Sequence, residues 1–122
     1  MILVDTSVWI DHLRRREPTL TATLDDGQIL MHPFVLGELA CGNLASRSKV
    51  LSLMQDLPKA PVATDAEALD FIERHQLMGR GIGYVDVHLL ASVALAGASS
   101  LWTRDARLAT VAGDMALAYA KG

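Results

Sequence analysis

Three short apolar runs are each followed by a segment with helical features, and this alternation most restricts the folds open to the chain. The runs are "ILV" at 2–4, "QILMH" at 28–32 and "SSLWT" at 99–103. A continuous apolar run is typical of a strand buried on both faces of a parallel sheet. The pattern therefore predicts an α/β fold, a three-layer α/β/α sandwich with a central parallel sheet.

Capping and helix-breaking residues indicate where the helices begin and end. Thr6 or Ser7 is expected to cap the first helix, and Thr64 with Glu67 has the spacing of a capping box. Gly79 is expected to close the helix that Thr64 opens. The expected helices cover about 8–16, 20–25, 34–41, 43–57, 65–78, 84–96 and 104–112, and one further very short strand is expected within 58–64.

Length and composition favour one domain over residues 1–122. Hydrophobic residues make up 51% of the chain, enough for a core without disulfide or metal cross-links. Cys41 is the one cysteine, which excludes an internal disulfide and favours a reducing compartment. The first residues lack the basic leader of a signal peptide, and the charge-free run ending at Trp102 is too short and too interrupted to span a bilayer. We expect a cytoplasmic protein that does not enter membranes.

Four carboxylates follow strands or begin helices, although they are far apart in the sequence. Asp5 directly follows the first apolar run, and Glu38 lies in the first turns of the helix after the second. Asp86 begins the apolar helix at 84–96, and Asp105 follows the third run by two residues. Ligands of open α/β sheets bind outside the carboxyl ends of the strands. We therefore expect the four acids to share one edge of the sheet.

Each acid taken singly also has an explanation without catalysis. Asp86 and Asp105 suit a helix N-terminus, where free backbone N–H groups and the helix dipole favour a carboxylate. Asp5 suits a turn or cap. Glu38 suits such a role least, because its apolar and small neighbours in "FVLGELACG" predict a half-buried side chain.

Four carboxylates in one pocket repel one another unless a cation neutralises them. Mg²⁺ or Mn²⁺ is the expected ion, because it prefers oxygen ligands and commonly bridges to phosphate. Cys41 stands alone and no two histidines have zinc-site spacing. The matching reaction is metal-assisted phosphodiester hydrolysis, in which the ion activates water and stabilises the leaving oxygen.

The charge balance around these acids is compatible with a nucleic-acid substrate. The net charge of −3 at pH 7 argues weakly against one, but without the four acids it would be +1. A basic rim that binds an RNA backbone is expected from Arg14, Arg15, Arg80 and Arg104. Solvated helix faces explain these arginines as well, and Asp11 is expected to be an ordinary solvated helix acid.

Hydroxyl and imidazole groups near the acids have open roles. Thr6, Ser7 and Thr103 are expected either to orient a carboxylate or a bound water, or to cap helices and turns. His32 and His88 are expected to be surface or half-buried residues. Either assignment leaves the four acids as the centre of the predicted site.

The acids lie in three segments: "ILVDTSVWIDHLR", "HPFVLGELACG" and "GIGYVDVHLLASVALAGASSLWTRDARLA". "DTS" or "TRD" alone occurs widely, but all the segments in this order and at these intervals are specific. Together they resemble the PIN domain, and within it the VapC-like toxins of bacterial toxin–antitoxin modules. The resemblance extends from Ile2 to about Ala109.

The resemblance implies a compact α/β/α fold and an Mg²⁺- or Mn²⁺-dependent endoribonuclease that cleaves RNA. It also implies a homodimer and a cognate antitoxin, whose C-terminal segment fills the acidic pocket, often with an arginine. A late strand at about 116–119 would fit the family's sheet. The family's acidic quartet falls on Asp5, Glu38, Asp86 and Asp105, and its hydroxyl positions fall on Thr6, Ser7 and Thr103.

Other protein classes fit the sequence less well. A phosphatase of the haloacid-dehalogenase type needs a second aspartate two residues after the first, where this chain has Ser7. A receiver domain needs a lysine after the last strand, where "SLWTRDARL" contains Arg104 instead. The alternative from another class is a non-catalytic PIN-like module that binds RNA or protein. The complete set of four acids argues against it.

Overall fold

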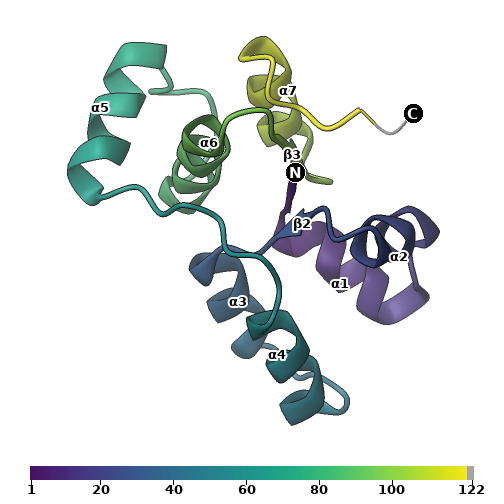
Figure 1. Cartoon of the computed structure of the whole chain (residues 1–122). Helices are drawn as coiled ribbons and strands as arrows, with labels where there is room; N and C mark the ends of the chain where they lie inside the picture. The colour runs from purple at the N-terminus through teal and green to yellow at the C-terminus, as the bar shows by residue number, and fades with distance from the viewer. Residues whose placement is uncertain (121–122) are drawn as a thin grey trace.

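The computed structural model describes residues 1–120, in which strands and helices alternate as the sequence predicts (Figure 1). The elements are β1 (Ile2–Val4), α1 (Thr6–Arg15), α2 (Pro18–Asp25), β2 (Ile29–Leu30), α3 (Pro33–Ala40), α4 (Arg47–Gln55), α5 (Asp65–His75), α6 (Tyr84–Ala96), β3 (Ser100–Trp102) and α7 (Ala106–Asp114).

The three strands form one parallel sheet in the order β2-β1-β3. Ile2 pairs with Ile29 on one side, and Val4 pairs with Trp102 on the other. The first strand of the chain is thus the central strand. Its side chains are all buried, because both faces of the sheet are covered.

A single parallel bridge extends the sheet at each edge. Met31 pairs with Lys59 beside β2, and Leu101 pairs with Ala118 beside β3. The backbone N–H of Tyr119 donates to the Leu101 carbonyl at 2.9 Å. The short strands expected within 58–64 and near 116–119 are therefore present only as these bridges.

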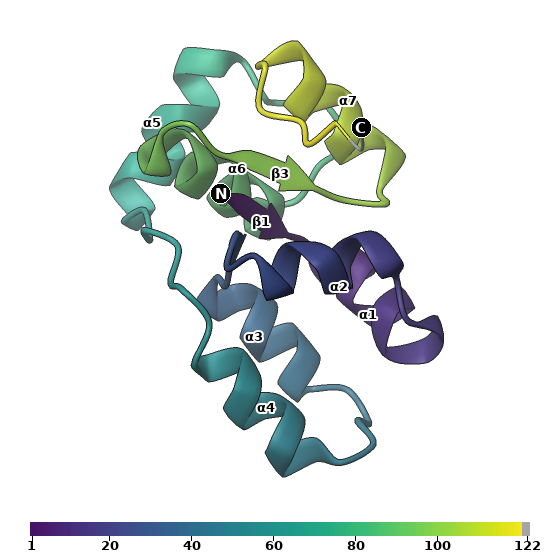
Figure 2. The same cartoon turned by 45° about the vertical axis from the view of Figure 1, so that its right-hand side comes forward.

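Helices cover both faces of the sheet. The chain moves from β1 to β2 in one direction and from β2 to β3 in the other, so right-handed crossovers place the connecting helices on opposite faces. Figures 1 and 2 show α1 and α2 on one side of the strands, with α5 and α6 on the other. The α/β/α arrangement with a central parallel sheet is confirmed.

The core fills both faces of the sheet and includes the middle of α6. Trp9 and Trp102 are buried in it, as is the run 87–93 of α6. The ends of α6 reach the surface, where Tyr84 and Leu95 are exposed, so the helix is less enclosed than its apolar sequence suggests. None of the helices formed by residues 1–120 is both long enough and apolar enough to cross a membrane.

Several helix ends differ from the predicted ones. The side chain of Asp5, rather than Thr6 or Ser7, caps α1, because the chain enters the helix directly from β1. The predicted capping box of α5 is confirmed, but α5 ends at His75. Gln76 takes the left-handed conformation with φ of 52°, so the helix stops before Gly79.

The helix predicted at 43–57 begins four residues later than expected. Ser46 precedes α4 with a left-handed φ of 52°, which ends the preceding turn. The Arg47 guanidinium donates to the carbonyls of Gly42 and Ala40. These bonds satisfy carbonyl groups at the end of α3 and stabilise the turn between the two helices.

Candidate active site

The carboxyl ends of β1 and β3 lie side by side at the point where the chain connections diverge. The Asp5 N–H donates to the Trp102 carbonyl at 2.9 Å, which joins the two strand ends. The chain leaves β1 toward β2, whereas it leaves β3 toward the opposite edge. Such a switch point is where open α/β sheets bind their ligands.

Asp5 is fixed at this point by three hydrogen bonds. Its Oδ1 accepts from the Thr6 N–H at 2.8 Å, and its Oδ2 accepts from Ser7 Oγ at 2.9 Å and Thr103 Oγ1 at 2.7 Å. The residue is only 8% exposed. Both oxygens are therefore oriented by the protein at the base of the site.

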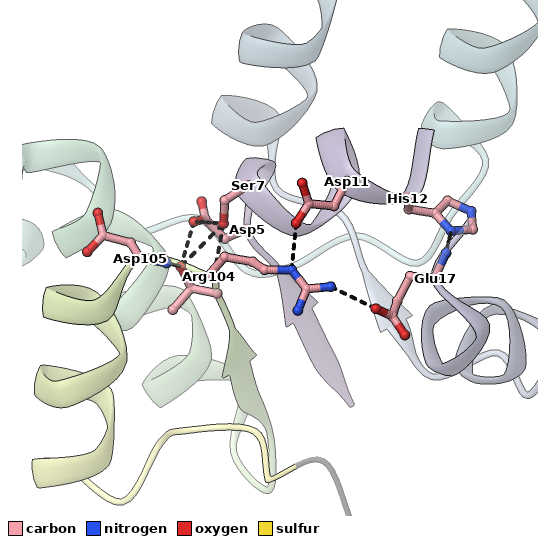
Figure 3. Close-up of polar contacts among 8 residues, drawn as sticks. Asp5, Ser7, Asp11, His12, Glu17, Arg104 and Asp105 are labelled. Atoms are coloured by element: carbon pink, nitrogen blue, oxygen red, sulfur yellow. Dashed lines mark hydrogen bonds and ion pairs between the residues drawn. The ribbon is translucent and has the colours of Figure 1, made fainter. Parts of the chain in front are cut away.

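Arg104, next to Asp105, is tied to the start of α1 through Ser7 (Figure 3). The Arg104 N–H donates to Ser7 Oγ, and the Asp105 N–H donates to Thr103 Oγ1, both at 3.0 Å. The Asp105 carboxylate also accepts from backbone N–H groups in the first turn of α7, at 2.9 and 3.1 Å. Asp105 is thus both the N-cap of α7 and a neighbour of the hydroxyl groups that hold Asp5.

Glu38 lies on α3 and approaches the site through Thr6. Thr6 Oγ1 donates to Glu38 Oε1 at 2.7 Å. The expectation that Glu38 is half-buried is wrong, because its side chain is exposed. Val35 and Leu39, four residues apart, occupy the buried face of α3. Glu38 falls on the neighbouring face and is open to solvent.

Asp86 is linked to the other acids by charge repulsion rather than by hydrogen bonds through a hydroxyl group. It lies in the first turn of α6, and its Oδ2 accepts from the Gly83 N–H at 3.0 Å. Partial burial raises the pKa of Asp86, and the nearby charges of Asp5, Asp105 and Glu38 raise it further, whereas the bond from Gly83 opposes the shift. The charges of all three other predicted acids thus act on this one carboxyl.

The donor set suits a hard divalent cation that retains water. All four candidate ligands are carboxylates, the oxygen donors that Mg²⁺ and Mn²⁺ prefer. Across residues 1–120, no three Asp, Glu, His or Cys side chains form a ready-made metal cluster. Mg²⁺ in enzymes is commonly held by one or two carboxylates with water and substrate phosphate, rather than by a complete protein cage. The repulsion that raises the pKa of Asp86 is what such an ion would relieve.

Comparison with known proteins identifies the family of the chain. Residues 2–114 match the family described as the PIN domain. The chain belongs to the PIN-domain family. It is also similar to two curated proteins named ribonuclease VapC32, from the Mycobacterium tuberculosis strains CDC 1551 / Oshkosh and ATCC 25618 / H37Rv. Each is 47% identical over 121 residues, covering 99% of this chain and 98% of the relative. The resemblance to VapC-like PIN domains is confirmed.

This PIN domain contains a buried histidine pair beside the site. His32 and His88 are 0% and 1% exposed, which corrects the expectation of surface or half-buried residues. His32 Nδ1 accepts from the Phe34 N–H at 3.0 Å and caps α3. Burial, together with His88, lowers the pKa of His32 to about 4. His32 is therefore a neutral structural group at the start of the helix that carries Glu38.

The four arginines predicted to bind RNA lie in two places. Arg14 and Arg15, at the end of α1, are exposed. With Arg16, Arg104 and two acids, they line a cavity of about 390 Å³. Arg80 is paired with an acid near the end of α7, Asp114, at 2.7 Å.

Arg104 is paired with two acids that sequence reasoning did not place near the site. Its Nε lies 2.7 Å from Asp11 Oδ2, and its Nη2 lies 2.7 Å from Glu17 Oε2. Asp11 is therefore an ion-pair partner as well as a surface helix acid. The signal available in the sequence was the shared sheet edge expected for the four acids, because Arg104 lies beside one of them and the first helix begins beside another.

Proposed function

We propose that this chain is a metal-dependent endoribonuclease, the toxin component of a toxin–antitoxin module, formed by one PIN domain. The observation that carries the proposal is the hydrogen bonding at the switch point of the sheet, where Thr6 links Asp5 to Glu38 and Thr103 links Asp5 to Asp105. The charges of these acids also act on Asp86. Membership of the PIN family, and 47% identity to proteins named ribonucleases, support the same activity.

The carboxylates have distinct roles in the proposed reaction. Asp5 and Asp86 are the principal ligands of Mg²⁺ or Mn²⁺, and Glu38 and Asp105 complete the pocket directly or through water. The bound ion would activate water and stabilise the leaving oxygen. The Thr6 N–H and the hydroxyl groups of Ser7 and Thr103 orient the Asp5 carboxylate. The Gly83 N–H orients that of Asp86.

The RNA backbone is proposed to approach over the end of α1. Arg14, Arg15 and Arg16 are exposed and line one cavity beside the segment that carries Asp105. Such a concentration of positive charge favours contact with phosphates. Arg80 lies in another cavity with Arg107 and is proposed as a second backbone contact, after exchange of its surface ion pair with Asp114.

The proposed inhibitor is a cognate antitoxin. A mostly apolar groove of about 310 Å³ is lined by residues of α1 and α3, including Ile10, Leu13 and Leu39, and reaches Glu38. The groove is thus continuous with the acidic site. An antitoxin segment with apolar side chains and a terminal arginine would complement both parts.

The chain is proposed to act as a homodimer in the cytoplasm. We propose a homodimer, for which Leu69 on α5 and Leu95 on α6 offer exposed apolar side chains on two helices that pack together. The proposed location is the cytoplasm, where RNA and a co-expressed antitoxin are present.

RNA cleavage by the purified protein tests the proposed activity. The wild type is expected to cleave a mixed RNA in Mg²⁺ or Mn²⁺, leaving 5′-phosphate and 3′-hydroxyl ends. Asp5→Asn is expected to lose cleavage, because the variant removes a ligand charge while an amide oxygen can still cap α1. Asp70→Asn is the matched control, since Asp70 lies in an exposed ion pair on α5.

The same assay distinguishes the alternative from another class. A wild-type protein that binds the RNA without cleaving it would favour a non-catalytic PIN-like module. Cleavage by Asp5→Asn at the wild-type rate would remove Asp5 from the site.

A further inference from the structure

The side chain of Arg104 spans two helices next to the proposed site (Figure 3). Its Nε faces Asp11 of α1 and its Nη2 faces Glu17, the N-cap of α2, each at 2.7 Å. Two short charge-assisted contacts on different nitrogens fix the plane of a guanidinium group as well as its position. Arg104 is therefore held in one orientation.

The two carboxylate partners have unequal exposure. The Asp11 side chain is 51% exposed and that of Glu17 is 15% exposed, while Arg104 is 37% exposed. A single exposed ion pair contributes little. Glu17, however, is itself fixed, because its Oε1 accepts from the Thr19 N–H at 3.3 Å and its backbone N–H donates to His12 Nδ1 at 2.9 Å. Glu17 is therefore held in place at the turn between α1 and α2.

The backbone of Arg104 is fastened as well. Its N–H donates to Ser7 Oγ, whose hydroxyl donates to Asp5. On either side of Arg104 stand Thr103, which donates to Asp5, and Asp105, a proposed ligand. The residue thus connects α1 and α2 to the segment that contains two site residues.

We propose that Arg104 is a positioning residue for RNA cleavage, which holds Thr103 and Asp105 in place through Asp11 and Glu17. This inference rests on the proposed function. It differs from the expectation that Arg104 binds the RNA backbone, because two carboxylates already balance the charge of its guanidinium group. We call Arg104 with Asp11 and Glu17 the clamp. The clamp acts through the geometry of the site rather than through contact with the substrate.

The two roles predict opposite effects for the acidic partners. If Arg104 positions the site, Asp11→Asn and Glu17→Gln release the clamp and lower kcat, as Arg104→Gln does. If Arg104 binds RNA, removal of the same two acids frees its charge and lowers KM. Steady-state kinetics on one RNA oligonucleotide, in saturating Mn²⁺, separates these outcomes.

The expected result is a fall in kcat of roughly 10- to 100-fold for Arg104→Gln, because small displacements of reacting groups have effects of this size. KM and the salt dependence of RNA binding are expected to stay near the wild-type values. Asp11→Asn is also expected to lower kcat. Arg104→Lys is expected to lower kcat less than Arg104→Gln does. An ammonium group keeps the charge but cannot bind both carboxylates in the fixed geometry of a guanidinium group.

Two arginine variants serve as controls. Arg15→Gln removes an exposed arginine of the same cavity and is expected to raise KM and weaken the salt dependence, with kcat retained. Arg74→Gln breaks an exposed ion pair with Asp70 on α5 and is expected to change neither constant. The proposal is overturned if Arg104→Gln behaves like Arg15→Gln, or if Asp11→Asn and Glu17→Gln leave kcat unchanged.

A measurement independent of activity tests the clamp itself. The backbone N–H groups of Arg104 and Asp105 are hydrogen-bonded to Ser7 and Thr103, so their hydrogen exchange reports whether the segment stays in place. Faster exchange in Arg104→Gln and Asp11→Asn, but not in Arg74→Gln, is expected. Unchanged exchange in both clamp variants would refute the positioning role. A wild type that fails to cleave RNA would refute the proposed function, while the exchange data would still decide on the clamp.

Discussion

Asp5 shows how one carboxylate meets two requirements at once. It caps α1 through the Thr6 N–H and faces two hydroxyl groups through its other oxygen. The sequence left a choice between a capping aspartate and a site aspartate. The two are compatible, because a cap that directly follows a central strand stands at the carboxyl end of the sheet, where a ligand would bind.

The hydroxyl of Thr103 is predicted to matter for both stability and activity. Thr103→Val removes the donor to Asp5 Oδ2 and the acceptor for the Asp105 N–H. The loss is expected to be about 1–2 kcal/mol in unfolding free energy, with a reduced cleavage rate. Thr103→Ser, which keeps the hydroxyl, is the control. Urea unfolding and cleavage assays check both, and equal activity of the two variants would exclude the role given to this hydroxyl.

The raised pKa of Asp86 predicts a pH-dependent stability of the metal-free protein. Because the folded chain retains this proton to a higher pH than the unfolded chain, stability falls as the pH rises from the ordinary aspartate pKa through the raised one. Asp86→Asn lacks this titration but keeps an acceptor for the Gly83 N–H. In EDTA, its melting temperature is expected to exceed that of the wild type near neutral pH, and the difference should shrink on acidification. A pH-independent difference would contradict the shift.

At the scale of elements, α7 begins with an acid that has both a structural and a proposed catalytic role. Asp105→Asn can still accept from the N–H groups of the first turn, whereas Asp105→Ala cannot. Only the alanine variant is therefore expected to lose stability, about 1 kcal/mol. Both are expected to lose RNA cleavage. Thermal melting with parallel cleavage assays checks this, and an active asparagine variant would mean that Asp105 is only a cap.

The elements were predictable to the extent that they depend on local sequence. Apolar runs and the capping box of Thr64 and Glu67 gave the alternation and the start of α5 correctly. The end of α5 was missed, because Gln76 takes a left-handed conformation usually left to glycine. Glu38 was placed on the correct helix, but its exposure was predicted wrongly. The exposure depends on which face of α3 packs against the core, and the residues next to Glu38 in the sequence do not show which face that is.

At the scale of the whole molecule, the candidate site depends on contacts between distant segments. The carboxyl-end rule for parallel sheets was enough to bring Asp5 and Asp105 together in advance. It did not predict that Arg104 reaches Asp11 and Glu17, since that contact depends on how α1 and α2 turn back over the sheet. The burial of His32 likewise depends on a distant segment, because its ring lies 6.5 Å from that of His88 on α6.

The central claim is that RNA cleavage requires a divalent cation at the four acids. The most direct measurement is the initial rate of RNA cleavage against free Mn²⁺ concentration, for the wild type and Glu38→Gln, with EDTA as the zero point. We predict no cleavage in EDTA, a wild-type rate that rises to saturation with Mn²⁺, and a much lower rate for Glu38→Gln across the titration. Wild-type cleavage that persists at full rate in EDTA would contradict the claim.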